Sequence, residues 1–209
     1  MILDALDVQF CRGAAQIVAP VWEGLAGFAD AALKHWHEPD QGIWEVRGDP
    51  KHFTASKEMC WVAAARAADL AEERGDGECA QRWRAGADEI KAEVLDKGVS
   101  ARGVFRQHYE TDDLDASLLL LLPIMGFLPP DEERVKSTVL AIADELTKDG
   151  LVLRYRVEGT DTGFAGEEGT FTICSFLAGD RAGDDRRDRA RACPVPEATV
   201  VRRALAALR

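Results

Sequence analysis

Residues 54–73 read Thr-Ala-Ser-Lys-Glu-Met-Cys-Trp-Val-Ala-Ala-Ala-Arg-Ala-Ala-Asp-Leu-Ala-Glu-Glu, and this stretch decides the fold class. Its apolar residues recur at the spacing of a helix, and Thr54 is a residue type that caps helix N-termini. The pattern predicts one long helix from Thr54 to about Glu73. The apolar positions of this helix are Met59, Trp61, Val62, Ala65 and Leu70.

Helical periodicity continues on both sides of this stretch. We expect helices over residues 21–36, 78–95, 131–147 and 168–176, and a short apolar helix that begins at Asp113 and ends at Pro123. Residues 151–157 alternate weakly, as in a short strand or an extended turn. The inward-facing residues are Trp22, Leu25, Phe28 or Ala29, Ala32 and Trp36 in the first helix, Trp83, Ile90 and Val94 in the next, and Val135, Val139, Ile142 and Leu146 later.

Long polar, glycine-rich loops separate these helices, over residues 37–53, 98–112 and 149–168. Long ordered loops on a helical scaffold are where functional sites usually lie. The sequence therefore predicts an all-α protein, built from helix pairs with functional loops at one end.

Composition limits the possible function. The chain has 209 residues, 46% hydrophobic and 30% charged, enough for one globular domain. A net charge of −11 argues against a nucleic-acid partner, and the longest apolar run, 118–122, is too short to cross a membrane. No basic and apolar leader opens the chain. The cysteines, at 11, 60, 79, 174 and 193, lack metal-ligand spacing, so we expect free thiols in a cytoplasmic protein without metal or cofactor.

One loop concentrates the residues of a chemical site. Residues 38–48 read Glu-Pro-Asp-Gln-Gly-Ile-Trp-Glu-Val-Arg-Gly, and they are followed by the segment from His52 to Lys57. A carboxyl group held against an indole can stay protonated near neutral pH and so protonate a leaving group. Glu45, next to Trp44, is the candidate for such an acid.

Six sequence blocks follow one another along the chain: Gly42-Ile-Trp-Glu-Val-Arg-Gly48, His52-Phe-Thr-x-Ser-Lys57-x-Met-Cys-Trp61, Leu114-Asp-Ala-Ser-Leu118, Gly126-Phe-Leu-Pro-Pro130, Arg154-Tyr155 and Glu167-Glu-Gly-Thr-Phe171 with Cys174-Ser-Phe176. Together they resemble glycoside hydrolase family 15, and within it the sequences of bacterial trehalases and glucoamylase-like proteins are the most similar. The resemblance covers nearly all of residues 1–176 and implies part of an (α/α)6 toroid that hydrolyses α-glucosidic bonds with inversion.

The resemblance also implies roles for single residues. Glu45 resembles the general acid, and Arg154 resembles the cationic contact to the sugar in the glucose-binding subsite. Trp44, Arg47, His52 and Lys57 fall where the family lines its pocket. The expected substrate is therefore a small α-glucoside such as trehalose, maltose or an oligosaccharide. The oligomeric state is not indicated.

Several of these residues also have simpler interpretations. Glu167 and Glu168 could be a second carboxylate pair that contacts sugar, but acids also favour a helix N-terminus. Trp61 fits the core as well as a sugar face, and His52 could be purely structural. The cluster of Asp112, Asp113 and Asp115 resembles a metal site, yet Asp113 more simply caps the helix that follows.

Residues 177–209 differ from the rest, which divides the chain into a partial catalytic barrel, 1–176, and an aberrant tail. The tail has 8 Arg and no Lys or aromatic residue. One interpretation is a disordered charged tail. The other is a frameshift, because the back-translated tail, when read from the second base of each codon, admits an amphipathic helix pair with a Trp after Phe176. The family's general base would follow that segment, so we expect the chain alone to be inactive. The rival hypotheses are a catalytically dead remnant and an unrelated helical scaffold.

Overall fold

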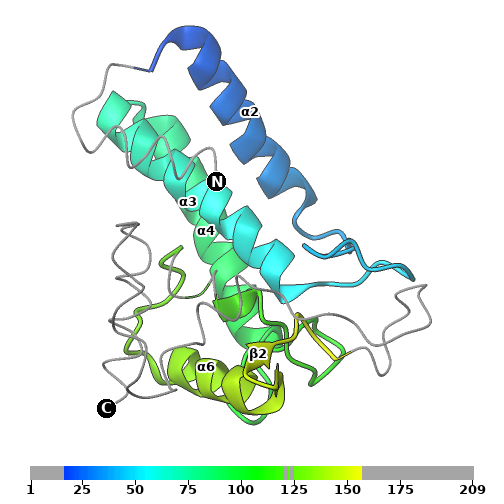
Figure 1. Ribbon diagram of the computed structural model, residues 1–209. Coiled ribbons are helices and arrows are strands. Elements are labelled where there is room, and N and C mark those ends of the chain that lie inside the picture. Colours follow the sequence, from blue (N-terminus) through cyan, green and yellow to red (C-terminus); the bar gives the residue numbers. More distant parts are fainter. Residues whose placement is uncertain (1–16, 120–121, 123–124, 157–209) are drawn as a thin grey trace, which may run out of the picture.

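The computed structural model describes residues 17–119, 122 and 125–156. Three long helices, α2 (Ala19–His35), α3 (Thr54–Arg74) and α4 (Gly77–Lys97), pack side by side, with α3 antiparallel to α4 (Figure 1). The shorter α6 (Glu133–Glu145) is followed by a hairpin of β1 (Thr147–Lys148) and β2 (Leu151–Val152), in which Thr147 pairs with Val152. The all-α class and the toroid-type helix pairing expected from the sequence are confirmed.

Helix α3 is the centre of this packing because it carries small side chains on several faces. Small residues let neighbouring helices approach closely, so α3 contacts both α2 and α4. A close approach also occurs between α2 and α4, where a Cβ on Gly86 would overlap the Leu33 side chain. The buried apolar residues of α3 are Ala55, Val62, Ala64, Ala65, Ala67, Ala68, Leu70 and Ala71.

Local signals explain where these helices begin and end. Gly75 adopts a left-handed conformation with φ of 81° after the last turn of α3, where its N–H bonds back to the carbonyls of Ala71 and Glu72. Asp76 then caps α4 by accepting a hydrogen bond from the Cys79 amide at 3.2 Å. The turn between the two helices is therefore encoded locally.

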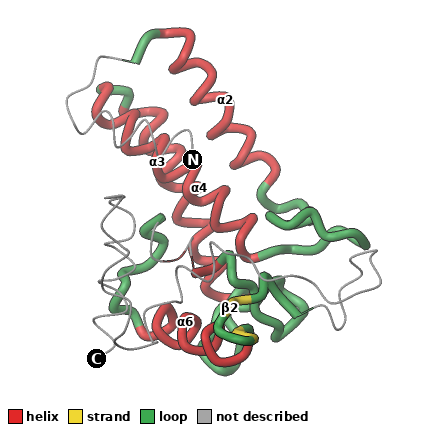
Figure 2. The backbone as a smooth tube through the Cα atoms, viewed as in Figure 1, coloured by secondary structure: helices red, strands yellow, loops and turns green. Residues whose placement is uncertain are grey.

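Loops 37–53 and 98–112 lie at one end of the helices, as the sequence predicted (Figure 2), whereas most of loop 149–168 lies outside the described residues. The Thr54 amide, at the start of α3, donates to the Gln107 carbonyl at 2.9 Å, and Phe53 forms an isolated bridge with His108. These contacts join the loop before α3 to the loop after α4. They create the platform on which the candidate site is built.

Most expected core positions are confirmed, and the exceptions have physical reasons. Val135, Ile142 and Leu146 are buried. Of the alternatives Phe28 and Ala29, the structure buries Ala29, and Phe28 is 58% exposed because α2 buries only a narrow stripe. Asp113 does not cap a helix, since residues 113–115 are irregular and helix appears only from 118. The helix expected over 168–176 and the tail 177–209 lie outside the described residues.

Candidate active site

The loop that carries Glu45 is closed by its own polar groups. The backbones of Asp40 and Lys51 exchange two hydrogen bonds of 2.9 Å, which brings the two ends of the loop together. The Asp40 carboxylate accepts hydrogen bonds from the Gly42 amide and from the Ser56 hydroxyl, the latter at 2.8 Å. One carboxylate thus fixes the loop to the first turn of α3.

The turn at the tip of the loop has an unusual backbone. Gly42 has φ of 71°, and a Cβ there would lie 2.9 Å from the Phe53 ring, so this position requires glycine. Glu45 has φ of 50°, a left-handed conformation that is uncommon and costly for a residue with a side chain. Such strain persists only where the surroundings impose it, and it is frequent at active sites. Glu45 is exposed at this tip.

Lys57 lies beneath the loop rather than in an open cleft. Its side chain is only 2% exposed, and its ammonium group donates to the Glu38 carbonyl and lies 4.0 Å from the Asp40 carboxylate. Burial lowers the pKa of Lys57, and the charge of Asp40 opposes that shift. Its contacts hold the loop in place, and its expected contact with a sugar stays a prediction.

Side chains from three distant segments meet beside Glu45. The Trp44 indole N–H donates to the Asp115 carboxylate at 2.9 Å. The Arg154 guanidinium carbon lies 5.2 Å from the centre of the Trp44 ring and 5.6 Å from that of Tyr155. Such a distance is typical of a cation–π contact. The predicted sugar contact, Arg154, is therefore packed on the residue that precedes the predicted acid.

Asp115 is the buried centre of this cluster and was missed by the sequence-based assignment of site residues. It is 1% exposed, and its carboxylate also accepts a hydrogen bond of 2.8 Å from the Ser117 amide. Burial raises the pKa of Asp115, while the hydrogen bonds from Trp44 and Ser117 and the charge of Arg154 oppose that rise. The sequence signal was its place in the Leu114–Leu118 block.

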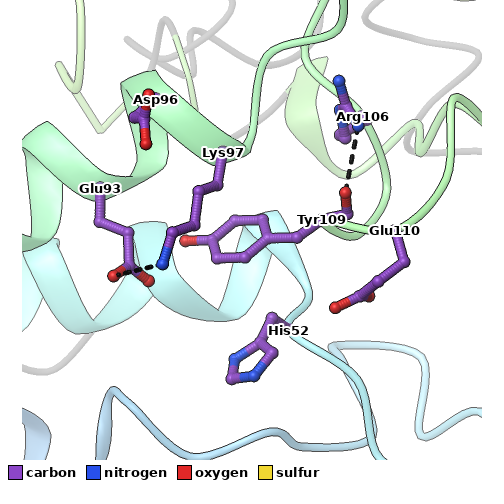
Figure 3. Close-up of a pocket in the computed structure, with 7 residues that line it drawn as sticks. All are labelled: His52, Glu93, Asp96, Lys97, Arg106, Tyr109 and Glu110. Atoms are coloured by element: carbon purple, nitrogen blue, oxygen red, sulfur yellow. Dashed lines mark hydrogen bonds and ion pairs between the residues drawn. The ribbon is translucent and has the colours of Figure 1, made fainter.

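A cavity of about 410 Å³ lies at the same end of the helices (Figure 3). His52 lines it together with the C-terminal turns of α4 and the following loop, and its ring stacks on Tyr109 with a 5.7 Å centroid distance. The complete lining is His52, Glu93, Asp96, Lys97, Arg106, Tyr109 and Glu110. The structure thus groups His52 with these residues and not with Trp44 and Arg154.

The lining of this cavity is a network of opposite charges. Lys97 pairs with Glu93 at 3.1 Å, and Arg106 lies 3.6 Å from Asp112. Burial raises the pKa of Tyr109, and the charge of Glu93 adds to the rise. In the described part of the chain, His52 Nδ1 and Arg106 Nε are buried without a hydrogen-bond partner.

The other predicted site residues are less well placed. Arg47 is exposed on the loop tip, and Glu167 and Glu168 lie outside the described residues. Trp61 belongs to the core, where it meets Phe127 edge-to-face at 5.0 Å. Within residues 17–119, 122 and 125–156, no group of three or more His, Cys, Asp or Glu could hold a metal ion. Among the helices described, none is both long and apolar enough to cross a membrane.

Comparison with known proteins links this site to a family of enzymes. The family model described as Glycosyl hydrolases family 15 matches residues 7–208. The trehalase of Mycobacterium tuberculosis (strain ATCC 25618 / H37Rv) is 59% identical over 175 residues, which is 84% of this chain and 25% of that protein. The trehalase of Mycolicibacterium smegmatis (strain ATCC 700084 / mc(2)155) is 63% identical over 161 residues, 77% of this chain and 24% of that protein. The chain therefore spans about a quarter of the length of the curated relatives it matches.

Solved structures share the fold. A glycosidase in complex with glucose superimposes with a TM-score of 0.60 and 23% identity, over 73% of this chain and 41% of that one. The wild-type form of a glycosidase gives the same values. At this identity the likeness supports the fold alone, and it agrees with the helix pairs described above.

Proposed function

Because the chain belongs to glycosyl hydrolases family 15, we propose that it is a section of the catalytic barrel of an inverting α-glucosidase of the trehalase or glucoamylase type. The observation that carries the proposal is the packing of Arg154 on Trp44, which is the residue immediately before Glu45 in the sequence. A positioned acid is useful only beside the groups that hold its substrate. The substrate would be a small α-glucoside, with trehalose favoured by the relatives' names.

In this proposal Glu45 is the general acid. Inverting hydrolysis uses one carboxylic acid to protonate the glycosidic oxygen, and a second carboxylate, roughly 6.5–9.5 Å away, to activate water. Glu45 is exposed at the tip of a loop whose base is fixed by Asp40 and Lys57, so its carboxyl group can reach a bound ligand. None of the described residues is assigned as the base.

Arg154 and Trp44 would form the sugar contact. A guanidinium group offers several hydrogen-bond donors to hydroxyls, and the indole offers an apolar face and a ring edge. The hydrogen bond of the Trp44 indole N–H is already accepted by the Asp115 carboxylate, so the sugar would contact a face of the indole rather than its N–H. Arg47 and His52 would contribute from the loop tip and the adjoining cavity, and Glu167 and Glu168 from the segment after Arg154.

The alternative function is a catalytically dead remnant that retains sugar binding at most. One observation favours it. Glu45 is exposed, while the indole of the neighbouring Trp44 contacts Asp115 and Arg154. An exposed carboxyl group lacks the apolar surroundings that suit a general acid near neutral pH.

An activity assay on two proteins separates these functions. The 209-residue chain is assayed for glucose release from trehalose and maltose, and we expect negligible turnover. The matching 161 residues of the Mycolicibacterium smegmatis trehalase are then replaced by those of this chain. We expect this chimera to be active and to release one β-glucose and one α-glucose from each trehalose, because inversion occurs only at the attacked anomeric carbon.

Substitutions in the chimera then test the acid. Glu45→Gln should lower kcat by at least about 100-fold, the lower range for a lost acid–base group. Glu89→Gln, at an exposed position on α4, is the matched control and should leave the rate unchanged. A folded but inactive chimera would support the remnant, whereas full activity of Glu45→Gln would remove Glu45 from the mechanism.

We also propose a cytoplasmic location. Cys60 and Cys79, the cysteines within the described residues, are free thiols. Burial raises the pKa of the Cys60 thiol, which makes it unreactive. Persistent thiols are typical of a reducing compartment. Fractionation of cells that express the tagged chain tests this assignment.

A further inference from the structure

Asp115 connects the three segments of the candidate site. Its carboxylate accepts hydrogen bonds from the Trp44 indole and from the Ser117 amide, at 2.9 and 2.8 Å. The next residue, Ala116, donates its amide proton to the Arg154 carbonyl at 2.8 Å. The Glu45 loop, the turn after loop 98–112 and the segment after β2 therefore all meet at residues 115–117.

The Trp44 indole is held in two directions by this arrangement. Its ring edge is fixed by Asp115, and one ring face is covered by the Arg154 guanidinium. An aromatic ring with both edge and face engaged cannot turn about its side-chain bonds without losing one contact. Asp115 is 1% exposed, so it serves other protein groups and not a ligand in solvent.

This constraint matters because the next residue has a strained backbone. Glu45 has φ of 50°, a left-handed conformation that is unfavourable for a residue with a Cβ. The loop can keep such a conformation only if residues on both sides are fixed. Val46 is fixed by the hydrogen bond of its amide to the Gln41 carbonyl at 2.9 Å, and Trp44 is fixed by Asp115.

We propose that Asp115 is a positioning residue, which sets the orientation of Trp44 and Arg154 and thereby aims Glu45 at the substrate. Its role in catalysis rests on the proposed function, whereas its role in orienting Trp44 does not. Asp115 acts through the Trp44 indole and through its negative charge opposite Arg154. It neither touches the sugar nor exchanges a proton with it.

The orienting role is tested on the 209-residue chain by NMR of indole N–H groups labelled with ¹⁵N. Trp44→Phe identifies the Trp44 signal among those of the five tryptophans. Asp115→Ala should move that signal upfield, because the indole loses its carboxylate acceptor. Asp115→Asn keeps a weaker neutral acceptor and should give an intermediate shift. Asp113→Asn, at an exposed position two residues away, should leave the signal unchanged.

The outcomes of this test are decisive for the orienting role. An unchanged Trp44 signal in folded Asp115→Ala would overturn it. If Asp115→Ala does not fold, Asp115→Asn decides, since an unmoved Trp44 signal in that variant would overturn the role equally. Circular dichroism and thermal unfolding of each variant establish which case applies.

The catalytic consequence is tested in the trehalase chimera. Asp115→Asn should lower kcat/KM by about 100-fold, the effect of a reacting group displaced by about 1 Å. Trp44→Phe should lower it similarly, and the double variant should lose little more, because the two residues act as one unit. Additive losses would overturn the coupling. An inactive parent chimera would count against the proposed function only, because the indole signals report on Asp115 independently.

Discussion

Lys57 and Glu58 are neighbours on α3, both almost completely buried at 1% and 0% exposure, yet they point into different surroundings. On the loop-facing side, the Lys57 ammonium meets the Glu38 carbonyl and the Asp40 carboxylate. Both carboxyl oxygens of Glu58, by contrast, are buried without a hydrogen-bond partner within the described residues.

The contrast shows where this fold can stabilise an ionised group. A buried charge is tolerated when a neighbouring segment supplies polar partners, and it is costly when no partner is supplied. Burial lowers the pKa of Lys57, against the opposing charge of Asp40, and it raises the pKa of Glu58 well above its ordinary value of 4.5. Lys57 thus anchors the loop that carries Glu45 to α3, whereas the buried Glu58 on the same helix destabilises the folded state.

The largest effect is expected when Lys57, which anchors the loop, is replaced. Lys57→Met should lower the free energy of unfolding by about 3 kcal/mol, because it leaves Glu38 and Asp40 without their buried partner. Chemical denaturation measures the change. Lys97→Met is the control, since Lys97 is 52% exposed in a surface pair and should matter by less than about 0.5 kcal/mol. A loss below about 1 kcal/mol for Lys57→Met would mean that the loop does not depend on this contact.

The second prediction concerns the buried carboxyl group of Glu58. Glu58→Leu should raise the free energy of unfolding at pH 7 by about 2 kcal/mol, because it removes a buried carboxyl group that lacks partners. Burial raises the pKa of Glu58 in the folded state. Glu58 therefore stabilises the folded state at pH values below its ordinary pKa, where the carboxyl group is neutral in both states. This stabilisation is lost as the pH rises toward the pKa that Glu58 has in the folded state.

The gain from Glu58→Leu should accordingly be larger near neutrality than at pH 4. Denaturation at several pH values measures this dependence. Asp88→Leu changes an exposed position on α4 and should leave the pH dependence of stability unaltered. An equal gain at all pH values would show that folding does not shift the pKa of Glu58.

The third prediction concerns the loop backbone. Gly42→Ala should destabilise the protein by about 1.5 kcal/mol, because φ is 71° and the new Cβ would lie 2.9 Å from the Phe53 ring. Gly24→Ala, in α2 with nothing near its Cβ, should instead stabilise it by about 0.8 kcal/mol through helix propensity. Thermal unfolding of both variants should therefore show shifts of opposite sign.

The smallest expected effect is at the candidate acid itself. Glu45→Gly should stabilise the protein by about 0.5 kcal/mol, since glycine adopts a φ of 50° without a Cβ penalty. Glu45→Ala keeps that penalty and should be nearly neutral. Differential scanning calorimetry of the pair separates them. Equal stability of the two variants would show that the left-handed backbone at Glu45 is not strained, and that the site keeps its carboxyl group at no cost.

The helices could be predicted from the sequence because their signals are local. Apolar periodicity placed α3 and α4 to within a few residues. The hairpin of β1 and β2 was predicted less well, since two-residue strands leave almost no pattern. Periodicity left Phe28 and Ala29 as alternatives for the buried face of α2, because it does not show which side of the helix has a neighbour, and the structure buries Ala29.

The candidate site was predicted only in part, for the same reason. Trp44 and Arg154 were named from family motifs, and the structure brings them together. Asp115 was set aside with a metal-like acidic cluster, because its partner Trp44 is 71 residues away in the chain. Lys57 was assigned to sugar binding, yet its internal contacts depend on how the loop folds back onto α3. Only tertiary structure reveals such contacts.

The sequence distance between Trp44 and Asp115 also has a consequence for the order of folding. Contacts across 71 residues carry a large loop-closure entropy, and they form late compared with the turns of a helix. During synthesis, α3 and α4 can pair as soon as both have emerged, but the indole must wait for the chain as far as Arg154. A ribosome-bound intermediate halted before Arg154 would therefore have formed helices but would lack the contact of Trp44 with Arg154. Its tryptophan emission would change when that contact forms.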